Sequence, residues 1–116
     1  MTSEPIFHIC RRDEWLTAQS RGTYPGSSQD QADGFIHFSG KRQVVASAAK
    51  HREGQAGLLL LTVDPDALGA ALKWEASRGG ALFPHLYGDL NLSAVLKVDD
   101  LPLDEDGTHR FPPMFD

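Results

Sequence analysis

Short apolar segments separated by polar turns recur along the chain, and most of them have the length and composition of β-strands. Bulky and β-branched residues alternate with polar ones in several, and "GLLLLTV" is apolar throughout, as a strand covered on both faces is. Strands are therefore predicted at residues 6–10, 35–39, 57–63, 71–77 and 93–98, with residues 82–90 a strand or extended loop broken by Pro84.

Two longer segments have helical character. In "RDEWLTAQSRG", Asp13 and Glu14 suit a helix N-terminus and Gly22 suits its end. Residues 41–53 form the second predicted helix, which Ser39 could cap. Its buried stripe is expected at Val44, Val45, Ala48 and Ala49. Residues 22–34, between the first helix and the second strand, are predicted to be a long loop, and such loops are often functional.

The element order is strand, helix, strand, helix and then strands. This order predicts an α+β fold with a split mixed β-sheet and two main helices. We expect a single domain over residues 1–98. Residues 99–116 form an acidic, proline-containing tail that is expected to lie over the surface or be partly mobile and to add little to the core, although Phe111 and Phe115 could still dock. Trp15 and Trp74 are both expected in the core.

Composition narrows the range of functions. A net charge of −5 and a pI of about 5.4 argue against a general binder of duplex nucleic acid or of membrane surfaces. Cys10 is the single cysteine, so there is no internal disulfide and no multi-cysteine zinc site. The N-terminus does not resemble a secretory signal. We expect a cytoplasmic protein whose partner is a small molecule.

Histidine occurs in three similar settings. His8, His37 and His85 are each flanked by apolar residues in a short predicted strand. Around an apolar cleft such side chains offer hydrogen bonding and proton transfer near neutral pH. We expect "FPHLYG" to form one wall of that cleft, with Pro84 preventing regular pairing there. The alternative is that each histidine is structural and bonded to a backbone carbonyl.

Other polar residues could complete the site. Glu75 is a candidate carboxylate for a ribose hydroxyl or a general base, or else part of a solvated face. Tyr87 could stack on a flat ring, or else fill the core. Ser39 shares a strand face with His37. Basic residues at the second helix and in the "RGG" turn are candidates for phosphate contacts, or else belong to a solvated face, namely Lys41, Arg42 and Arg78.

Two other kinds of site are weighed against this one. His8, His37, His85 and Glu75 are acceptable metal ligands, but no pair shows metalloprotease spacing, so no metal is assigned. "GFIHFSG" and "PGSSQ" are not the nucleophile elbow of a serine hydrolase.

The combination of "GFIHFS", "KWE" and "FPHLYGDLNLSAV" resembles a bacterial family catalogued as domain of unknown function 952, over residues 6–98. More distantly, the chain resembles the ADP-ribosyltransferase fold, including RNA 2′-phosphotransferases. That resemblance implies that His8 contacts a nucleotide ribose and that His37 lines the nicotinamide or base pocket. The chain departs from the superfamily pattern at two points. Ile9 stands where glycine is frequent, and the third motif lacks the usual catalytic glutamate.

The resulting hypothesis is a transferase of ADP-ribosyltransferase-like fold that acts on NAD or a related phosphorylated nucleotide. NAD would be a substrate, and no cofactor is assigned. His8, His37 and His85 would orient the ligand, and Glu75 or His85 would act as base. The alternatives are a non-catalytic module that binds a nucleotide-like ligand and a partner-binding protein with structural histidines.

Overall fold

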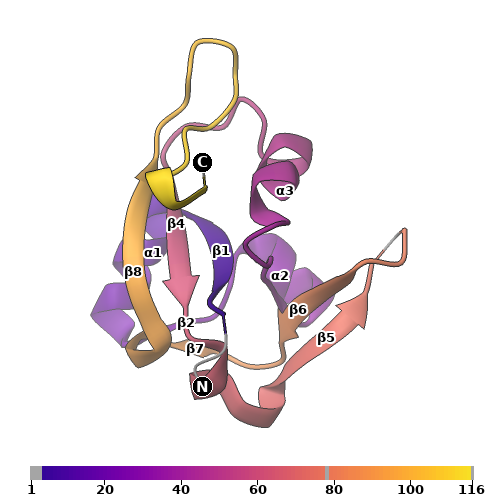
Figure 1. The fold of residues 1–116 in the computed structure, drawn as a ribbon. Helices are drawn as coiled ribbons and strands as arrows, with labels where there is room; N and C mark the ends of the chain where they lie inside the picture. Colours follow the sequence, from indigo (N-terminus) through magenta and orange to yellow (C-terminus); the bar gives the residue numbers. More distant parts are fainter. Residues whose placement is uncertain (1–3, 78, 116) are drawn as a thin grey trace.

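A three-stranded antiparallel sheet runs through the middle of the protein in a computed structural model that describes residues 4–77 and 79–115. Its strands are β1 (Ile6–Arg11), β4 (Leu58–Val63) and β8 (Val95–Leu101), in the order β1-β4-β8. All six residues of β4 are buried, as its continuous apolar sequence predicts. Figure 1 shows β4 between the other two strands.

A second sheet stands beside the first and carries two of the predicted histidines. It is formed by β3 (Ile36–His37), β6 (Leu82–Leu86) and β5 (Leu72–Ala76), in the order β3-β6-β5. A two-stranded pair joins β2 (Thr23–Tyr24) to β7 (Leu90–Asn91). The sheet is split, as expected, but every pairing among the described strands is antiparallel, so the prediction of a mixed sheet is wrong.

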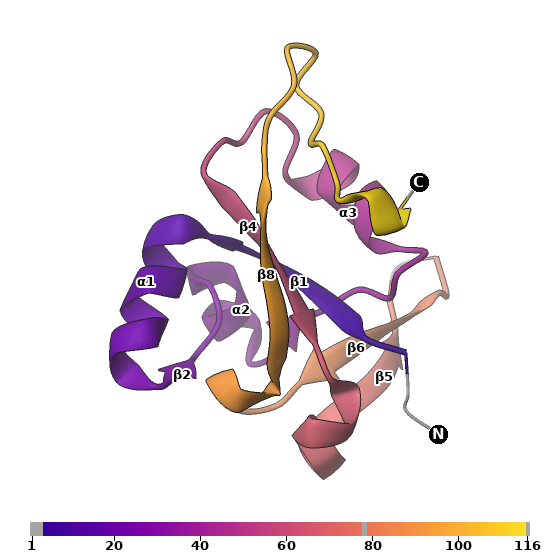
Figure 2. The same cartoon turned by 60° about the vertical axis from the view of Figure 1, so that its left-hand side comes forward.

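Helices cover both faces of the first sheet. The α-helices are α1 (Arg12–Arg21), α2 (Ser28–Asp33) and α3 (Val44–His51), and 3-10 turns follow at Pro65–Ala71, Leu92–Ala94 and Pro113–Phe115. Figure 2 shows α1 and α2 on one side of the sheet and α3 with the C-terminal segment on the other. Alternate residues of β1 therefore enter different cores. Ile6 and Cys10 pack in the first core, on the side of α1. Phe7 and Ile9 pack in the second core, on the side of α3.

Two helical predictions need correction. The segment expected to be a loop contains α2, because a Ser27 capping box starts a helix there. The second predicted helix begins at Val44, and Gln43 rather than Ser39 binds the free backbone N–H of Gly40. Val44 and Ala48 are buried as expected, whereas Val45 is exposed and Ala49 also faces solvent.

The two tryptophans differ. Trp15 is buried against the first core, but Trp74 is 50% exposed, so its predicted core position is wrong.

Toward the C-terminus, β8 continues to Leu101, three residues beyond the predicted strand end. Phe111 and Phe115 pack against the second core. None of the helices in the described ranges is both long enough and apolar enough to span a bilayer.

Candidate functional site

The register between β3 and β6 places two histidines on the same face of the second sheet. His37 pairs directly with His85, and their ring centroids are 5.6 Å apart at an interplanar angle of 68°. Side chains of directly paired residues lie on the same face of a sheet. We call the side chains gathered here the histidine face: Phe35, His37, Glu75, His85 and Tyr87.

Glu75 connects His85 to Tyr87. The ring Nδ1–H of His85 donates to Glu75 Oε1 over 2.8 Å, and the Tyr87 hydroxyl donates to the same oxygen over 2.6 Å. The hydrogen bond from Tyr87, followed by that from His85, lowers the pKa of Glu75, and the same contact raises the pKa of Tyr87. Nδ1 of His85 is therefore engaged by Glu75, and Nε2 is the ring nitrogen that remains for a ligand.

Two carboxylates bind His37. Its Nδ1 lies 2.5 Å from Asp30 Oδ1, and its Nε2 lies 3.1 Å from Asp33 Oδ2. The hydrogen bond to Asp30 raises the pKa of His37, and burial opposes that shift only in part. The Nδ1–H of His37 donates to Asp30, and the Asp33 carboxylate beside Nε2 adds a contact that also favours the protonated ring, on a surface where His37 is 41% exposed.

Asp30 is buried, and the start of α2 positions it. Its Oδ2 accepts from the backbone N–H of Ser27, and its own backbone N–H donates to Ser27 Oγ. Burial would raise the pKa of Asp30, but hydrogen bonds from the His37 side chain and from the backbone N–H groups of Ser27 and His37 lower it to about 2. Gly26 allows this packing, since its φ is 94° and a Cβ there would lie 2.7 Å from Asp30 Cβ.

His8 lies behind the histidine face and is not part of it. Its side chain is 3% exposed. Nδ1–H donates to the His37 carbonyl over 2.6 Å, and Nε2 accepts from the Tyr24 hydroxyl over 2.9 Å. Burial lowers the pKa of His8, which keeps the ring neutral. His8 therefore supports the backbone of His37 from the core and cannot touch a ligand on the outer surface.

An aromatic cluster surrounds the two outer imidazoles. The Phe35 ring stacks on His85 at 4.2 Å between centroids, and it lies 4.6 Å from His37 and 5.3 Å from Tyr87. Lys73 Nζ lies 5.3 Å from the Tyr87 ring centroid. A flat apolar surface next to fixed hydrogen-bonding groups suits a ligand with a planar ring.

The remaining predicted site residues lie elsewhere. Ser39 is buried, where its backbone pairs with Phe7 and its hydroxyl contacts Ser47. Lys41 lines a hollow on the opposite face of β5, Arg42 is exposed in the turn before α3, and Arg78 falls outside the described residues. Within the part of the chain that the structure covers, no group of three or more His, Cys, Asp or Glu side chains is placed to hold a metal ion.

Pro84 does not keep the segment out of regular pairing, contrary to prediction. β6 is the central strand of its sheet, and Pro84 pairs with Trp74. The Pro84 carbonyl accepts from the backbone N–H of Phe38. In an antiparallel ladder the N–H and C=O of one residue point to the same neighbour, so the N–H that proline lacks would also have pointed toward β3. β3 has already ended at His37, and the ladder therefore loses little at this point.

A protein-family model described as "Protein of unknown function (DUF952)" matches residues 9–98. The chain belongs to this DUF952 family. The matched range includes every residue of the histidine face together with Asp30 and Asp33, whereas His8 lies just before it. No match was found among curated proteins.

Solved structures resemble this DUF952 chain closely. The crystal structure of protein CC0527 from Caulobacter crescentus is 49% identical, covers 96% of this chain and 97% of its own, and has a TM-score of 0.91. The solution NMR structure of CC0527 is 52% identical, covers 90% of each chain and has a TM-score of 0.80. The fold of this DUF952 chain is therefore shared with CC0527 over nearly its whole length.

Sequence reasoning missed Asp30, Asp33 and Phe35. One signal could have found Asp30, because Ser27 and Asp30 have the spacing of a capping box. Its second role, as the partner of His37, depends on how α2 packs beside β3 and has no local signature. Strand alternation places Phe35 on the same face as His37, but its stacking on His85 follows from the β3–β6 register.

Proposed function

We propose that the histidine face binds the planar ring of a nucleotide and catalyses group transfer on it, with NAD or a related phosphorylated nucleotide as the substrate. The observation that carries this proposal is the pair of imidazoles in different states. His85 donates from Nδ1 to Glu75, so Nε2 is its nitrogen available to a ligand, whereas His37 is fixed through Nδ1 by Asp30, which raises its pKa. One ring can take a proton while the other donates hydrogen bonds to the ligand.

The charge of the face favours NAD among nucleotides. Asp30, Asp33 and Glu75 contribute three carboxylates around two imidazoles. The nicotinamide ring of NAD is a planar cation, so it suits an acidic surface with exposed aromatic rings better than a phosphate does. In this arrangement the ring lies against Phe35 and Tyr87, and the phosphates extend toward Lys73.

The proposed step uses NAD and an acceptor hydroxyl, which water can supply. His85 Nε2 removes the proton from an acceptor hydroxyl, whose oxygen attacks C1′ of the ribose. The bond between C1′ and the nicotinamide nitrogen breaks, and its electron pair leaves with neutral nicotinamide. His37, held through Nδ1 by Asp30, exchanges the Nε2 contact with Asp33 for a hydrogen bond to a ribose oxygen. His8 acts only as a positioning residue, because it is buried behind His37.

Nicotinamide release from NAD tests this proposal, with His85→Gln as the informative variant. Loss of a general base slows the reaction by roughly 10²- to 10⁴-fold. His51→Gln is the matched control, because His51 is exposed on α3 away from the face. Absence of nicotinamide release by the unaltered protein, or equal rates for the two variants, would refute catalysis on NAD.

A binding module is the second candidate function, and the two-sided fixation of His37 favours it. Both ring nitrogens are occupied by carboxylates, which suits steady recognition better than proton exchange. In that case NAD raises the melting temperature of the protein while no nicotinamide is released. A partner-binding role without any nucleotide predicts no thermal shift from NAD.

A further inference from the structure

A hollow of about 360 Å³ opens on the face of the β5–β6 hairpin opposite the histidine face. Leu72 and Trp74 line it, and they alternate along β5 with Lys73 and Glu75, which point to the other side. Its volume lies within the range of small-molecule sites. The two sites therefore share one strand but face different directions, and the proposed function makes no use of this one.

The hollow has an apolar side and a charged rim. Ile6 and Leu72 contribute buried or half-buried apolar surface, and Trp74 adds a large ring that is 50% exposed. Half-exposed tryptophan beside a hollow is unusual in a domain of this size, since burying such a ring is strongly favourable. The rim carries charges of both signs, with Lys41 opposed by Glu4 and Asp66.

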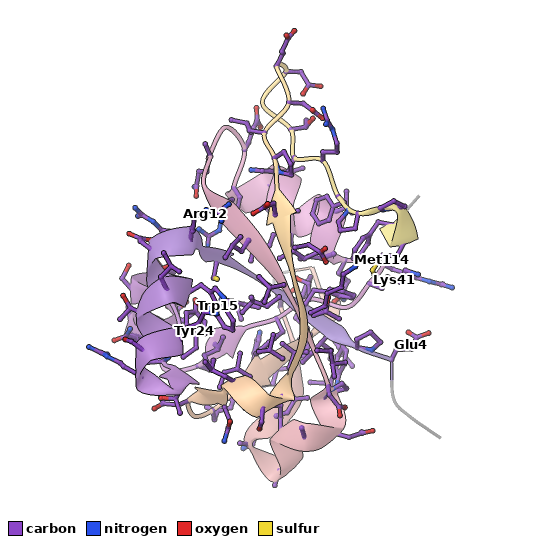
Figure 3. All side chains as sticks on the ribbon, turned by 90° about the vertical axis from the view of Figure 1, so that its left-hand side faces the viewer. Glu4, Arg12, Trp15, Tyr24, Lys41 and Met114 are labelled. Carbon is purple, nitrogen blue, oxygen red and sulfur yellow. The ribbon has the colours of Figure 1, made fainter. Side chains whose placement is uncertain are left out.

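Several contacts hold the walls in place before any ligand arrives. Gln43 accepts from the Gly40 backbone N–H over 2.8 Å and donates to the Leu82 carbonyl over 2.7 Å, which ties the Lys41 segment to β6. Asp64 accepts from the backbone N–H of Asp66 over 3.0 Å. A preorganised wall lowers the entropy cost of binding. Figure 3 shows Glu4 and Lys41 extending outward on the same side of the molecule.

We propose that this hollow binds a zwitterionic ligand of the aromatic α-amino-acid class. The flat side chain lies against Trp74, the carboxylate meets Lys41 and the ammonium group meets Glu4. A ligand with only a carboxylate leaves Glu4 without an ammonium partner and is repelled by the Glu4 carboxylate. A ligand with only an ammonium group leaves Lys41 unpaired.

Tryptophan fluorescence provides a direct measurement, because Trp74 is half-exposed and Trp15 is 7% exposed. Titration with L-phenylalanine should change the Trp74 emission and saturate at millimolar concentration or below. Phenethylamine lacks the carboxylate, and 3-phenylpropionate lacks the ammonium group. Each should bind at least about ten-fold more weakly, as expected for the loss of one charged hydrogen bond. No saturable signal, or equal binding of all three compounds, would overturn the proposal.

Variants locate the site. Lys41→Gln should weaken binding of L-phenylalanine about ten-fold or more, whereas Arg42→Gln should leave it unchanged, because Arg42 is exposed but does not line the hollow. An equal effect of the two substitutions contradicts the assignment. NMR shifts of the Ile6 and Leu72 methyl groups in the unaltered protein give a readout that needs no variant. Shifts confined to other methyl groups would place the ligand elsewhere.

Discussion

At the scale of single residues, the three candidate histidines are in three different states. His8 is buried and neutral, and it receives a hydrogen bond from Tyr24. The pKa of His37 is raised beside Asp30 and Asp33, and His85 donates from Nδ1 to Glu75. Their sequence settings are alike, so the difference comes from their partners in space. Each state leads to a different experimental signature.

The pH dependence of stability separates His8 from His37. The folded-state pKa of His37 is raised above 6.5, so its contribution is fully present below pH 6.5 and is lost as pH rises through the raised pKa. The pKa of His8 is lowered, so its contribution is present above pH 6.5 and is lost as pH falls through the lowered pKa.

These two residues therefore give a stability maximum near pH 6.5, measurable by urea unfolding across pH. His37→Gln should flatten the alkaline side of that profile and leave the acidic side in place. His51→Gln provides the exposed control. A His37→Gln profile that follows the unaltered protein above pH 6.5 contradicts the assigned charge.

The buried hydroxyl of Tyr24 gives a second residue-scale prediction. Tyr24→Phe removes the donor to His8 Nε2 and leaves a buried acceptor without its partner. Such a loss lowers the free energy of unfolding by about 1–3 kcal/mol. Tyr87→Phe is the comparison, because that hydroxyl is lost from an exposed position. Equal destabilisation by the two substitutions, in urea titrations, would show that His8 does not depend on Tyr24.

At the scale of elements, α2 links local capping to the site. Its capping box holds Asp30 at the N3 position of the helix, and the same carboxylate binds His37. The charge of His37 therefore depends on how a helix of six residues begins. Gly26 and Ser27, which touch no ligand, are part of the support of the site.

Ser27→Ala tests this link. Loss of the capping hydroxyl should lower the free energy of unfolding by about 0.5–2 kcal/mol. It should also lower the pKa of His37 toward 6.5, because Asp30 is then held less firmly; an NMR titration of the ring protons measures this. Ser28→Ala, at an exposed neighbouring position, should change neither quantity. A stable Ser27→Ala protein with an unchanged His37 titration would separate the cap from the site.

The sequence predicts some of these elements and not others, for physical reasons. The alternation in residues 6–10 correctly separates Ile6 and Cys10 from Phe7 and Ile9, because strand periodicity is a local property. Trp74 alternates in the same way, but no helix or strand of the described fold fully covers its face, and alternation alone cannot reveal that. Strand pairing likewise depends on distant segments, so the approach of His37 to His85 could only be suggested.

At the scale of the whole molecule, the central sheet has a core on each face, and the C-terminal segment completes the second one. Phe115 packs edge-on against Phe7 at 5.0 Å between centroids and also contacts Phe111. The acidic residues between β8 and this segment stay at the surface, with Asp104 paired to Arg110. The last residues therefore contribute apolar packing to the domain.

Phe115→Ala measures that contribution. Removing a half-buried aromatic ring should lower the free energy of unfolding by about 1 kcal/mol, roughly half of the value for a fully buried ring, measured by urea denaturation. Met114→Ala is the neighbouring control, since Met114 is an exposed side chain. A Phe115→Ala protein as stable as the control would show that the C-terminal segment adds nothing to the second core.

The direct pairing of His37 with His85 also restricts how this family can vary. Successive side chains of a strand alternate between its faces, so inserting or deleting one residue in β3 or β6 would turn one imidazole to the other side of the sheet. A shift by two residues would restore the face but move the rings apart along the strands. Homologues that retain the site should therefore place their length differences in the turn at residues 77–81 or in the segment before α2, and keep both strands free of gaps.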